Sequence, residues 1–134
     1  VGEFGTAITY DVVSAAGEYL GGIITPGAEI SIDALYERAA KLPKVELAQP
    51  RALIGKSTVE AIRSGIVYGF AGQVDGIVGR LRDELGEATA VLATGGLARA
   101  LVPAVRVTID EVDDLLTLTG LRLIWERNVP GESP

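Results

Sequence analysis

The segment that most constrains the fold is a long amphipathic stretch in the middle of the chain, residues 57–85. Ser57 is followed three residues later by Glu60, which is the pattern of a capping box at the start of a helix. From there to Leu85, apolar side chains recur at steps of three and four residues, the period of an α-helix. They are Val59, Ile62, Ile66, Phe70, Val74, Ile77, Leu81 and Leu85. The spacing predicts one helix from Ser57 to Leu85.

The same predicted helix carries a stripe of five glycines, each of which destabilises a helix by about 0.5–1 kcal/mol relative to alanine. A compensating contact is therefore expected. Either the stripe packs against the sheet of this chain, or it forms a helix–helix seam with a second copy. Apolar residues on flanking faces, including Val67, Tyr68 and Val78, favour burial on more than one side. We expect a homodimer through the helix Ser57–Leu85. The stripe consists of Gly65, Gly69, Gly72, Gly76 and Gly79.

The remaining elements predict an α/β domain. β-branched and aromatic runs indicate three antiparallel strands within the first 25 residues. Thr25 and Pro26 have the pattern of a helix start. We expect helices at Pro26–Leu42, from Thr94-Gly95-Gly96 to Leu101, and at Leu116–Asn128, and strands at Thr89–Ala93 and Arg106–Ile109. Three antiparallel strands followed by helices alternating with strands (α-β-α-β-α) predict a ribonuclease-H-like single lobe with a mixed sheet. A generic α/β sandwich is the alternative.

The composition excludes several kinds of chemistry. The 134 residues correspond to one domain and include neither cysteine nor histidine. A thiolate metal site, a cysteine nucleophile, a Ser-His-Asp triad and a histidine zinc site are therefore excluded. General acid or base chemistry would fall to Asp and Glu, or to Lys and Tyr.

Charge and hydropathy argue against nucleic-acid and membrane partners. Twelve basic and eighteen acidic residues give a net charge of −6. A nucleic-acid-binding domain is instead expected to carry clustered basic residues. No run approaches the ~20 apolar residues of a membrane span, and no signal-peptide pattern is present. We expect a cytoplasmic protein. Methionine is also absent and the first residue is Val1, which favours an excised or edited sequence over a natural chain of biased composition.

Two glycine-rich turns carry the candidate chemistry. The first is Glu3-Phe4-Gly5-Thr6-Ala7, where backbone amides could approach a phosphate and Glu3 could hold a cation. The second is Ala93-Thr94-Gly95-Gly96-Leu97, which links a strand to a helix N-terminus. Ligands of α/β sheets bind outside the carboxyl ends of the strands. Ordinary structural turns are the alternative for both.

Taken in order, these segments resemble the C-terminal half of type III pantothenate kinases, members of the actin-like ATPase and sugar kinase superfamily. A sugar kinase or an actin-like filament protein is a weaker match, because the run Tyr68-Gly69-Phe70-Ala71-Gly72 is specific to the pantothenate kinases. The matching stretches are residues 3–11, Gly21-Gly22-Ile23-Ile24-Thr25-Pro26-Gly27, Ile54-Gly55-Lys56-Ser57-Thr58-Val59-Glu60, residues 64–76, residues 93–98 and residues 116–128.

The resemblance implies an enzyme that phosphorylates pantothenate with ATP, the first step towards coenzyme A. It implies two ribonuclease-H-like lobes with ATP in the cleft, and a homodimer. Gly5 and Thr6 would face the phosphates, and Glu3 stands where the family has an Asp that binds the activating monovalent cation (K⁺ or NH₄⁺). Mg²⁺ would accompany the ATP. The adenosine motif would be Thr94, Gly95 and Gly96, and Thr58 would reach the pantothenate site of the partner subunit.

The resemblance also implies what these residues lack. The family's N-terminal lobe carries the first phosphate loop, and a Gly-x-Asp-Arg motif that would lie just before Val1 supplies the catalytic base. Residues 1–128 would form the C-terminal lobe and residues 129–134 a flexible tail. We expect negligible turnover from the chain alone, or a non-catalytic, excised or engineered dimeric scaffold. Asp11, Asp75 and Asp110 are candidate replacement bases, with Asp11 the best of them, and solvated or structural carboxylates are the alternative.

Overall fold

The structure, a computed structural model, describes residues 1–129, and in this part of the chain it contains one five-stranded mixed sheet. β1 (Gly2–Phe4), β2 (Ala7–Val13) and β3 (Tyr19–Pro26) form an antiparallel meander. β4 (Leu92–Thr94) runs parallel to β1, and β5 (Glu111–Val112) runs parallel to β4. The strand order is β3-β2-β1-β4-β5. The α/β fold class expected of a ribonuclease-H-like lobe is confirmed.

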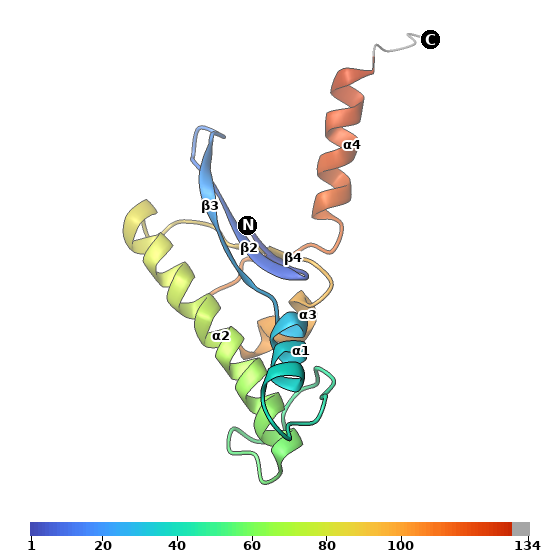
Figure 1. Cartoon of the computed structure of the whole chain (residues 1–134). Coiled ribbons are helices and arrows are strands. Elements are labelled where there is room, and N and C mark those ends of the chain that lie inside the picture. Colours follow the sequence, from blue (N-terminus) through green and yellow to red (C-terminus); the bar gives the residue numbers. More distant parts are fainter. Residues whose placement is uncertain (130–134) are drawn as a thin grey trace.

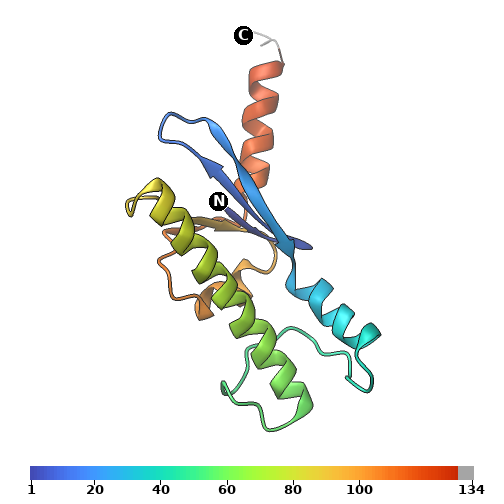
Figure 2. The same ribbon diagram turned by 60° about the vertical axis from the view of Figure 1, so that its left-hand side comes forward.

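The long helix α2 (Thr58–Leu85) packs across one face of the sheet (Figures 1 and 2). Its predicted start is confirmed, because Ser57 Oγ accepts a hydrogen bond from the Glu60 amide at 3.3 Å. The Glu60 carboxylate accepts from the Lys56 amide at 3.2 Å, one residue earlier than in a standard capping box. Gly86, with φ +106°, ends the helix as its C-cap.

The core lies between α2 and the sheet. Its sheet side is formed by side chains of β1 and β2, and its helix side by one face of α2. The short helix α3 (Ala98–Leu101) and the 3₁₀ turn η1 (Val102–Ala104) close one end. The buried residues of this core include Phe4, Ile8, Tyr10, Ile66, Phe70, Val74, Val78, Ala98 and Leu101.

The first helix, α1 (Ala28–Arg38), begins two residues later and ends four residues earlier than predicted. Pro26 is the last residue of β3, and Gly27 rather than Thr25 is the N-cap. The Thr25 hydroxyl is engaged elsewhere, since its one proton lies within hydrogen-bond reach of two acceptors, the Ile8 carbonyl at 3.2 Å and Gln73 Oε1 at 3.0 Å. The Thr25 side chain is therefore bonded to β2 and α2, and it does not cap α1 as the sequence pattern predicted.

The strand predicted at Arg106–Ile109 is wrong. One carboxylate oxygen of Asp75, on α2, accepts hydrogen bonds from the amides of Arg106 and Val107 at 2.8 and 2.9 Å. These amides are thus held by the helix instead of a neighbouring strand. The chain joins the sheet later, as the two-residue strand β5.

The strand and helix around Gly95 are also shifted from their predicted places. β4 covers Leu92–Thr94 rather than Thr89–Ala93, and α3 starts at Ala98 rather than at Thr94-Gly95-Gly96. Gly95 has φ +96°, which a right-handed helix cannot accommodate. The helix is only four residues long, so the dipole expected at this turn is small.

The last helix, α4 (Leu116–Asn128), is present as predicted but projects away from the sheet (Figures 1 and 2). It has no buried residue, and Trp125 is 64% exposed. Residues 130–134 of the predicted tail lie outside the described part of the chain. The exposed apolar side chains of this region are Leu115, Leu118, Leu121, Leu123, Ile124, Trp125 and Val129.

Candidate functional site

The two glycine-rich turns predicted from the sequence lie next to each other at the carboxyl ends of β1 and β4. The parallel pairing of these strands places Glu3 opposite Thr94. The chain therefore leaves both strands at the same edge of the sheet, into the Gly5–Thr6 turn on one side and into Gly95 on the other. This is the edge at which α/β sheets bind ligands.

Gly95 brings the second turn into direct contact with the end of β1. A Cβ atom at this position would lie 2.6 Å from the carbonyl oxygen of Phe4, and the positive φ disfavours any other residue. Two residues on, the Leu97 amide donates to the same Phe4 carbonyl at 3.0 Å. The backbone conformation of the turn is therefore set by its contact with Phe4.

Gly27 brings a third segment to this edge, and the sequence analysis did not identify it as a site residue. Its amide donates to the Thr6 carbonyl at 3.1 Å, and an added Cβ would overlap the Thr6 carbonyl oxygen. The N-terminus of α1, with its partial positive charge, consequently lies beside the Gly5–Thr6 turn. A glycine directly after Pro26 and directly before a helix was the available signal.

A hollow of about 270 Å³ opens beside the second turn. Thr94, Gly95 and Gly96 line it, as the sequence predicts, together with Arg99, Asp114 and Thr117, which the sequence analysis missed. Thr94 is buried and Gly96 is exposed, so the hollow has a closed floor and an open mouth. Arg99 comes from α3, Asp114 from the turn before α4 and Thr117 from the first turn of α4, and only the tertiary fold brings them together.

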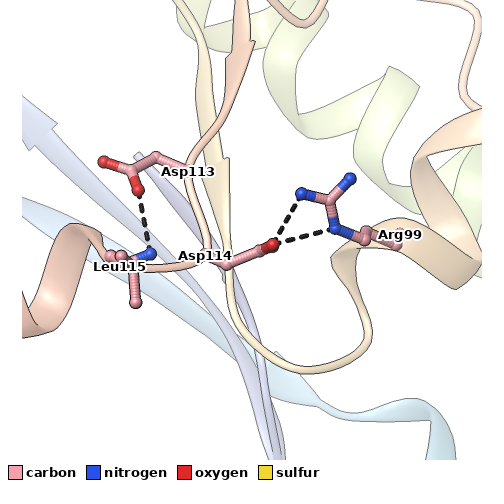
Figure 3. Close-up of polar contacts among 4 residues, drawn as sticks. All are labelled: Arg99, Asp113, Asp114 and Leu115. Carbon is pink, nitrogen blue, oxygen red and sulfur yellow. Dashed lines mark hydrogen bonds and ion pairs between the residues drawn. The ribbon is translucent and has the colours of Figure 1, made fainter.

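An ion pair spans one wall of the hollow (Figure 3). Arg99 Nη2 and Nε donate to the same Asp114 carboxylate oxygen at 2.6 and 2.9 Å. The hydrogen bond and charge of Asp114 raise the pKa of the Arg99 guanidinium. The neighbouring Asp113 Oδ1 accepts from the Leu115 amide at 2.8 Å, which fixes the chain where α4 begins.

Glu3, the candidate cation ligand, has an exposed side chain at the same edge. Its carboxylate oxygen Oε1 lies 3.8 Å from the position that a Cβ of Gly5 would occupy. Within residues 1–129 no group of three acidic side chains lies close enough together to hold a metal ion. A Mg²⁺ site commonly uses one or two carboxylates and completes its shell with water and substrate phosphates. Glu3 fits that limited role.

Thr58 lies away from the candidate site residues at the sheet edge. It is the exposed first residue of α2, and Figure 1 places that end of the helix far from the ends of β1 and β4. Nearby, Gly55 packs directly against the backbone of Ala61.

The three candidate replacement bases all accept hydrogen bonds within the fold. Asp75 holds Arg106 and Val107, as described above, and Asp110 Oδ2 accepts from the Val91 amide at 2.6 Å. Asp11 accepts from the Tyr19 hydroxyl at 3.1 Å and lies at the opposite end of β1 from Thr6. The geometry favours structural roles for these carboxylates.

The glycine stripe of α2 faces away from the rest of the chain. Apart from the neighbouring backbone of α2 itself, a Cβ atom at Gly65, Gly69, Gly72 or Gly79 would meet no atom of the described residues within 4 Å. At Gly76 it would meet only the end of the Arg80 side chain, at 3.3 Å. Packing of the stripe on the sheet, the first of the two predicted contacts, is thus not what the structure shows.

Comparison with known proteins identifies the family. The sequence profile of type III pantothenate kinases matches residues 1–80, more than half of the chain. The chain belongs to the type III pantothenate kinase family. It is 60% identical over 128 residues to a type III pantothenate kinase of Acidothermus cellulolyticus, and 60% identical over 126 residues to one of an Anaeromyxobacter species.

The members of this family that the chain matches are about twice its length. The alignments cover 96% and 94% of the chain but only 50% and 49% of the two relatives. A solved structure from Campylobacter jejuni, described as a conserved Baf family transcriptional activator, is also similar. It matches with a TM-score of 0.59 and 26% identity, over 95% of this chain and 56% of its own. Within the described residues, no helix is long and apolar enough to cross a membrane.

Proposed function

We propose that this chain is the C-terminal lobe of an ATP:pantothenate 4′-phosphotransferase, which catalyses the first step towards coenzyme A in the cytoplasm. The observation that carries this proposal is the meeting of two glycine turns and a helix N-terminus at one edge of the sheet. Gly5–Thr6, Gly95 and Gly27 are all held there by backbone contacts. The chain belongs to the type III pantothenate kinase family, and we propose that this edge forms one half of its nucleotide site.

The phosphate end of the nucleotide would lie at Gly5 and Thr6. Thr6 is exposed, so its hydroxyl is accessible to a ligand. The adjacent N-terminus of α1 favours negative charge through its partial positive charge and its free amides. This support differs from the sequence prediction, which placed the helix N-terminus at Gly95-Gly96.

The adenosine end would occupy the hollow beside Thr94, Gly95 and Gly96. The glycines leave the mouth of the hollow without side chains, and Arg99 and Asp114 form one wall. A guanidinium next to a base or a ribose supplies both hydrogen-bond donors and a planar stacking surface. Arg99 and Asp114 are therefore further candidates for nucleotide contact in this lobe.

Glu3 would provide the protein carboxylate for the activating cations. It lies beside Gly5, where the phosphates would be, and carboxylate oxygens suit both Mg²⁺ and K⁺. The bound metal would neutralise phosphate charge during transfer. Glu3 is one methylene longer than the Asp of the family pattern, so we expect weaker cation activation.

The outer face of α2 would form the homodimer. Glycines in a helix lower its stability unless a close backbone contact compensates, and no contact of that kind occurs within residues 1–129. A second copy of the same face would supply one by two-fold symmetry. Thr58, distant from the nucleotide edge of its own chain, would then reach the pantothenate site of the partner subunit.

A second lobe would be needed for turnover. Phosphoryl transfer depends on positioning and on charge stabilisation from both sides of the phosphate. Among the described residues, this edge supplies one side, with the exposed carboxylates of Glu3 and Asp114 and no lysine in the lining of the hollow. The unpartnered apolar helix α4 supports the same conclusion, since a second lobe would cover it.

The test is a calorimetric titration of ATP into the chain with Mg²⁺ and K⁺, followed by an assay for phosphopantothenate. We expect saturable ATP binding and no measurable product. Gly96→Leu, which fills the mouth of the hollow and has open space around it, should abolish binding. Gly79→Leu, on the outer face of α2, is the matched control. Absence of binding in both the unaltered chain and the control would contradict the proposed nucleotide site.

A non-catalytic dimeric scaffold is the second candidate function. The observation that favours it is the same glycine stripe, which makes no packing contact within the described chain. A second copy could supply that contact without any ligand. Self-association without any ATP binding would support the scaffold. The net charge of −6 argues against a nucleic-acid partner of the kind that the description of the Campylobacter protein suggests.

A further inference from the structure

The wall of the hollow formed by Arg99 and Asp114 offers a ligand a free carboxylate oxygen. Arg99 Nε and Nη2 both donate to the same atom, Asp114 Oδ2. The other oxygen, Oδ1, accepts no hydrogen bond from the described residues. The Asp114 side chain is 47% exposed and the Arg99 side chain 72%, so a molecule in the hollow that they line can reach both of them.

The same wall places hydrogen-bond donors next to this acceptor. A guanidinium carries five N–H groups in a fixed plane, and Asp114 engages only the Nε and Nη2 atoms of Arg99. The ion pair holds the two side chains in place relative to each other (Figure 3). A hydroxyl group both donates and accepts, so it matches an adjacent carboxylate oxygen and guanidinium better than a group that only accepts.

The charge of Asp114 argues against a phosphate group in this hollow. A carboxylate only accepts hydrogen bonds, and it repels a phosphate through their like charges. Gly5 and Thr6, where the phosphates of the nucleotide would lie, are not among the residues that line the hollow. The part of a nucleotide that enters the hollow is therefore an uncharged one, either the ribose or the adenine.

The lining of the hollow favours the ribose over the adenine. Besides the ion pair, it consists of Thr94, Gly95, Gly96 and Thr117. These six residues include no aromatic side chain, on which proteins commonly stack a base, and no leucine, isoleucine or valine. Two threonines and an ion pair instead form a polar surface, which suits a ring that carries hydroxyl groups.

We propose that Asp114, held in place by Arg99, recognises the ribose hydroxyls of the nucleotide and makes this lobe selective for ribonucleotides. A 2′- or 3′-hydroxyl donates to Asp114 Oδ1 and accepts from the remaining N–H groups of Arg99. Carboxylates recognise the ribose of NAD in dinucleotide-binding folds by the same kind of hydrogen bond. This inference rests on the proposed function, because it requires a nucleotide at this edge of the sheet.

The test is a calorimetric titration of the chain with ATP and with 2′,3′-dideoxy-ATP, which keeps the base and the phosphates but lacks both hydroxyls. We expect ATP to bind about tenfold more tightly, because the analogue makes no hydrogen bond to the carboxylate. Asp114→Ala should abolish this tenfold ratio, whereas a merely structural role of Asp114 would weaken both nucleotides equally and preserve it. Glu111→Ala removes the same charge from an exposed residue outside the lining of the hollow, and this matched control should keep the ratio.

Four outcomes would overturn the inference, and only the first would also contradict the proposed nucleotide site. The first is an unaltered chain that does not bind ATP. The second is equal affinity for ATP and dideoxy-ATP, which needs no variant to interpret. The third is a tenfold ratio that persists in Asp114→Ala, which means that other residues recognise the hydroxyls. The fourth is lost affinity for purine riboside triphosphate, which lacks the 6-amino group, without lost affinity for dideoxy-ATP, which means that the wall recognises the base.

Discussion

Two groups of glycines differ in what a methyl group added to them would contact. Gly27 and Gly95 lie at the sheet edge where strands end, and Gly69 and Gly72 lie on the outer face of α2. At the first two positions it would collide with the backbone of Thr6 or Phe4, and at the last two it would meet nothing within 4 Å. The glycines at the strand ends are therefore required by contacts within the chain. Those on α2 lower the stability of a helix that has room for side chains, and we propose that a contact outside the chain explains them.

Glycines in this sequence therefore indicate two different kinds of contact, one within the chain and one with another molecule. A glycine that the fold itself requires indicates where two segments of the same chain touch, and here it marks the candidate nucleotide edge. A glycine that the fold does not require indicates a surface kept flat for another molecule. The following substitutions test that division, beginning with the largest expected effect.

Gly95→Ala should destabilise the chain by about 2–4 kcal/mol, because the new methyl group overlaps the Phe4 backbone and the backbone has φ +96°. Urea unfolding measures the loss. The matched control is Gly96→Ala, one residue along, where nothing lies within 4 Å. Equal stabilities of the two variants would contradict the required contact between this turn and β1.

The core between β2 and α2 should respond to pH through Tyr10 of β2, because burial raises the pKa of its hydroxyl from the ordinary 10.0 to about 12. The hydroxyl loses its proton more easily in the unfolded chain, so folding is favoured fully below pH 10. The stability should fall by about 2–3 kcal/mol as the pH rises from 10 to 12. Urea unfolding at both pH values measures this fall.

Tyr10→Phe should reduce that alkaline loss, because phenylalanine has no proton to release. Other groups, including the lysines, titrate in the same range, and the difference between the two proteins removes their contribution. If the unaltered chain and the variant lost the same stability between pH 10 and 12, the Tyr10 hydroxyl would not be buried as described.

The beginning of α2 should depend on its cap. Ser57→Ala removes the acceptor of the Glu60 amide and should cost about 1 kcal/mol. Ser14→Ala, in the exposed turn between β2 and β3, also removes one acceptor of a backbone amide but caps no helix, so its effect should be smaller. Thermal unfolding ranks the two variants, and the reverse order would contradict the helix boundary.

Gly72→Ala should produce the smallest effect and one of opposite sign. In the monomer the substitution should stabilise α2 by about 0.5–1 kcal/mol, because alanine loses less backbone freedom on folding and has space here. Urea unfolding at a protein concentration low enough to prevent association is the measurement. A loss of stability under those conditions would mean that the outer face of α2 contacts its own chain.

Sequence patterns predicted the elements whose signals are local. The Ser57–Glu60 cap and the apolar spacing to Leu85 defined α2 within one residue. The Gly5–Thr6 and Thr94–Gly96 turns were found as candidate site segments for the same reason. That the two turns lie next to each other is a finding of the structure, in which β1 and β4 pair in parallel and end at one edge of the sheet.

Elements that depend on distant partners were placed wrongly or missed. The segment Arg106–Ile109 has the composition of a strand, but Asp75 from α2 binds its amides. Thr25 has the pattern of a cap, but Ile8 and Gln73 take its hydroxyl. Arg99 and Asp114 are separated by fifteen residues, and their pairing exists only in the folded chain.

The central claim is that the outer glycines of α2 are reserved for a second copy of the chain. Sedimentation equilibrium of the unaltered chain and of Gly72→Leu tests it most directly, because leucine fits the open space of the monomer but blocks a close helix–helix contact. We predict a concentration-dependent dimer for the unaltered chain and a folded monomer for the variant. A chain that stays monomeric at high concentration, or a variant that dimerises equally well, would contradict the claim.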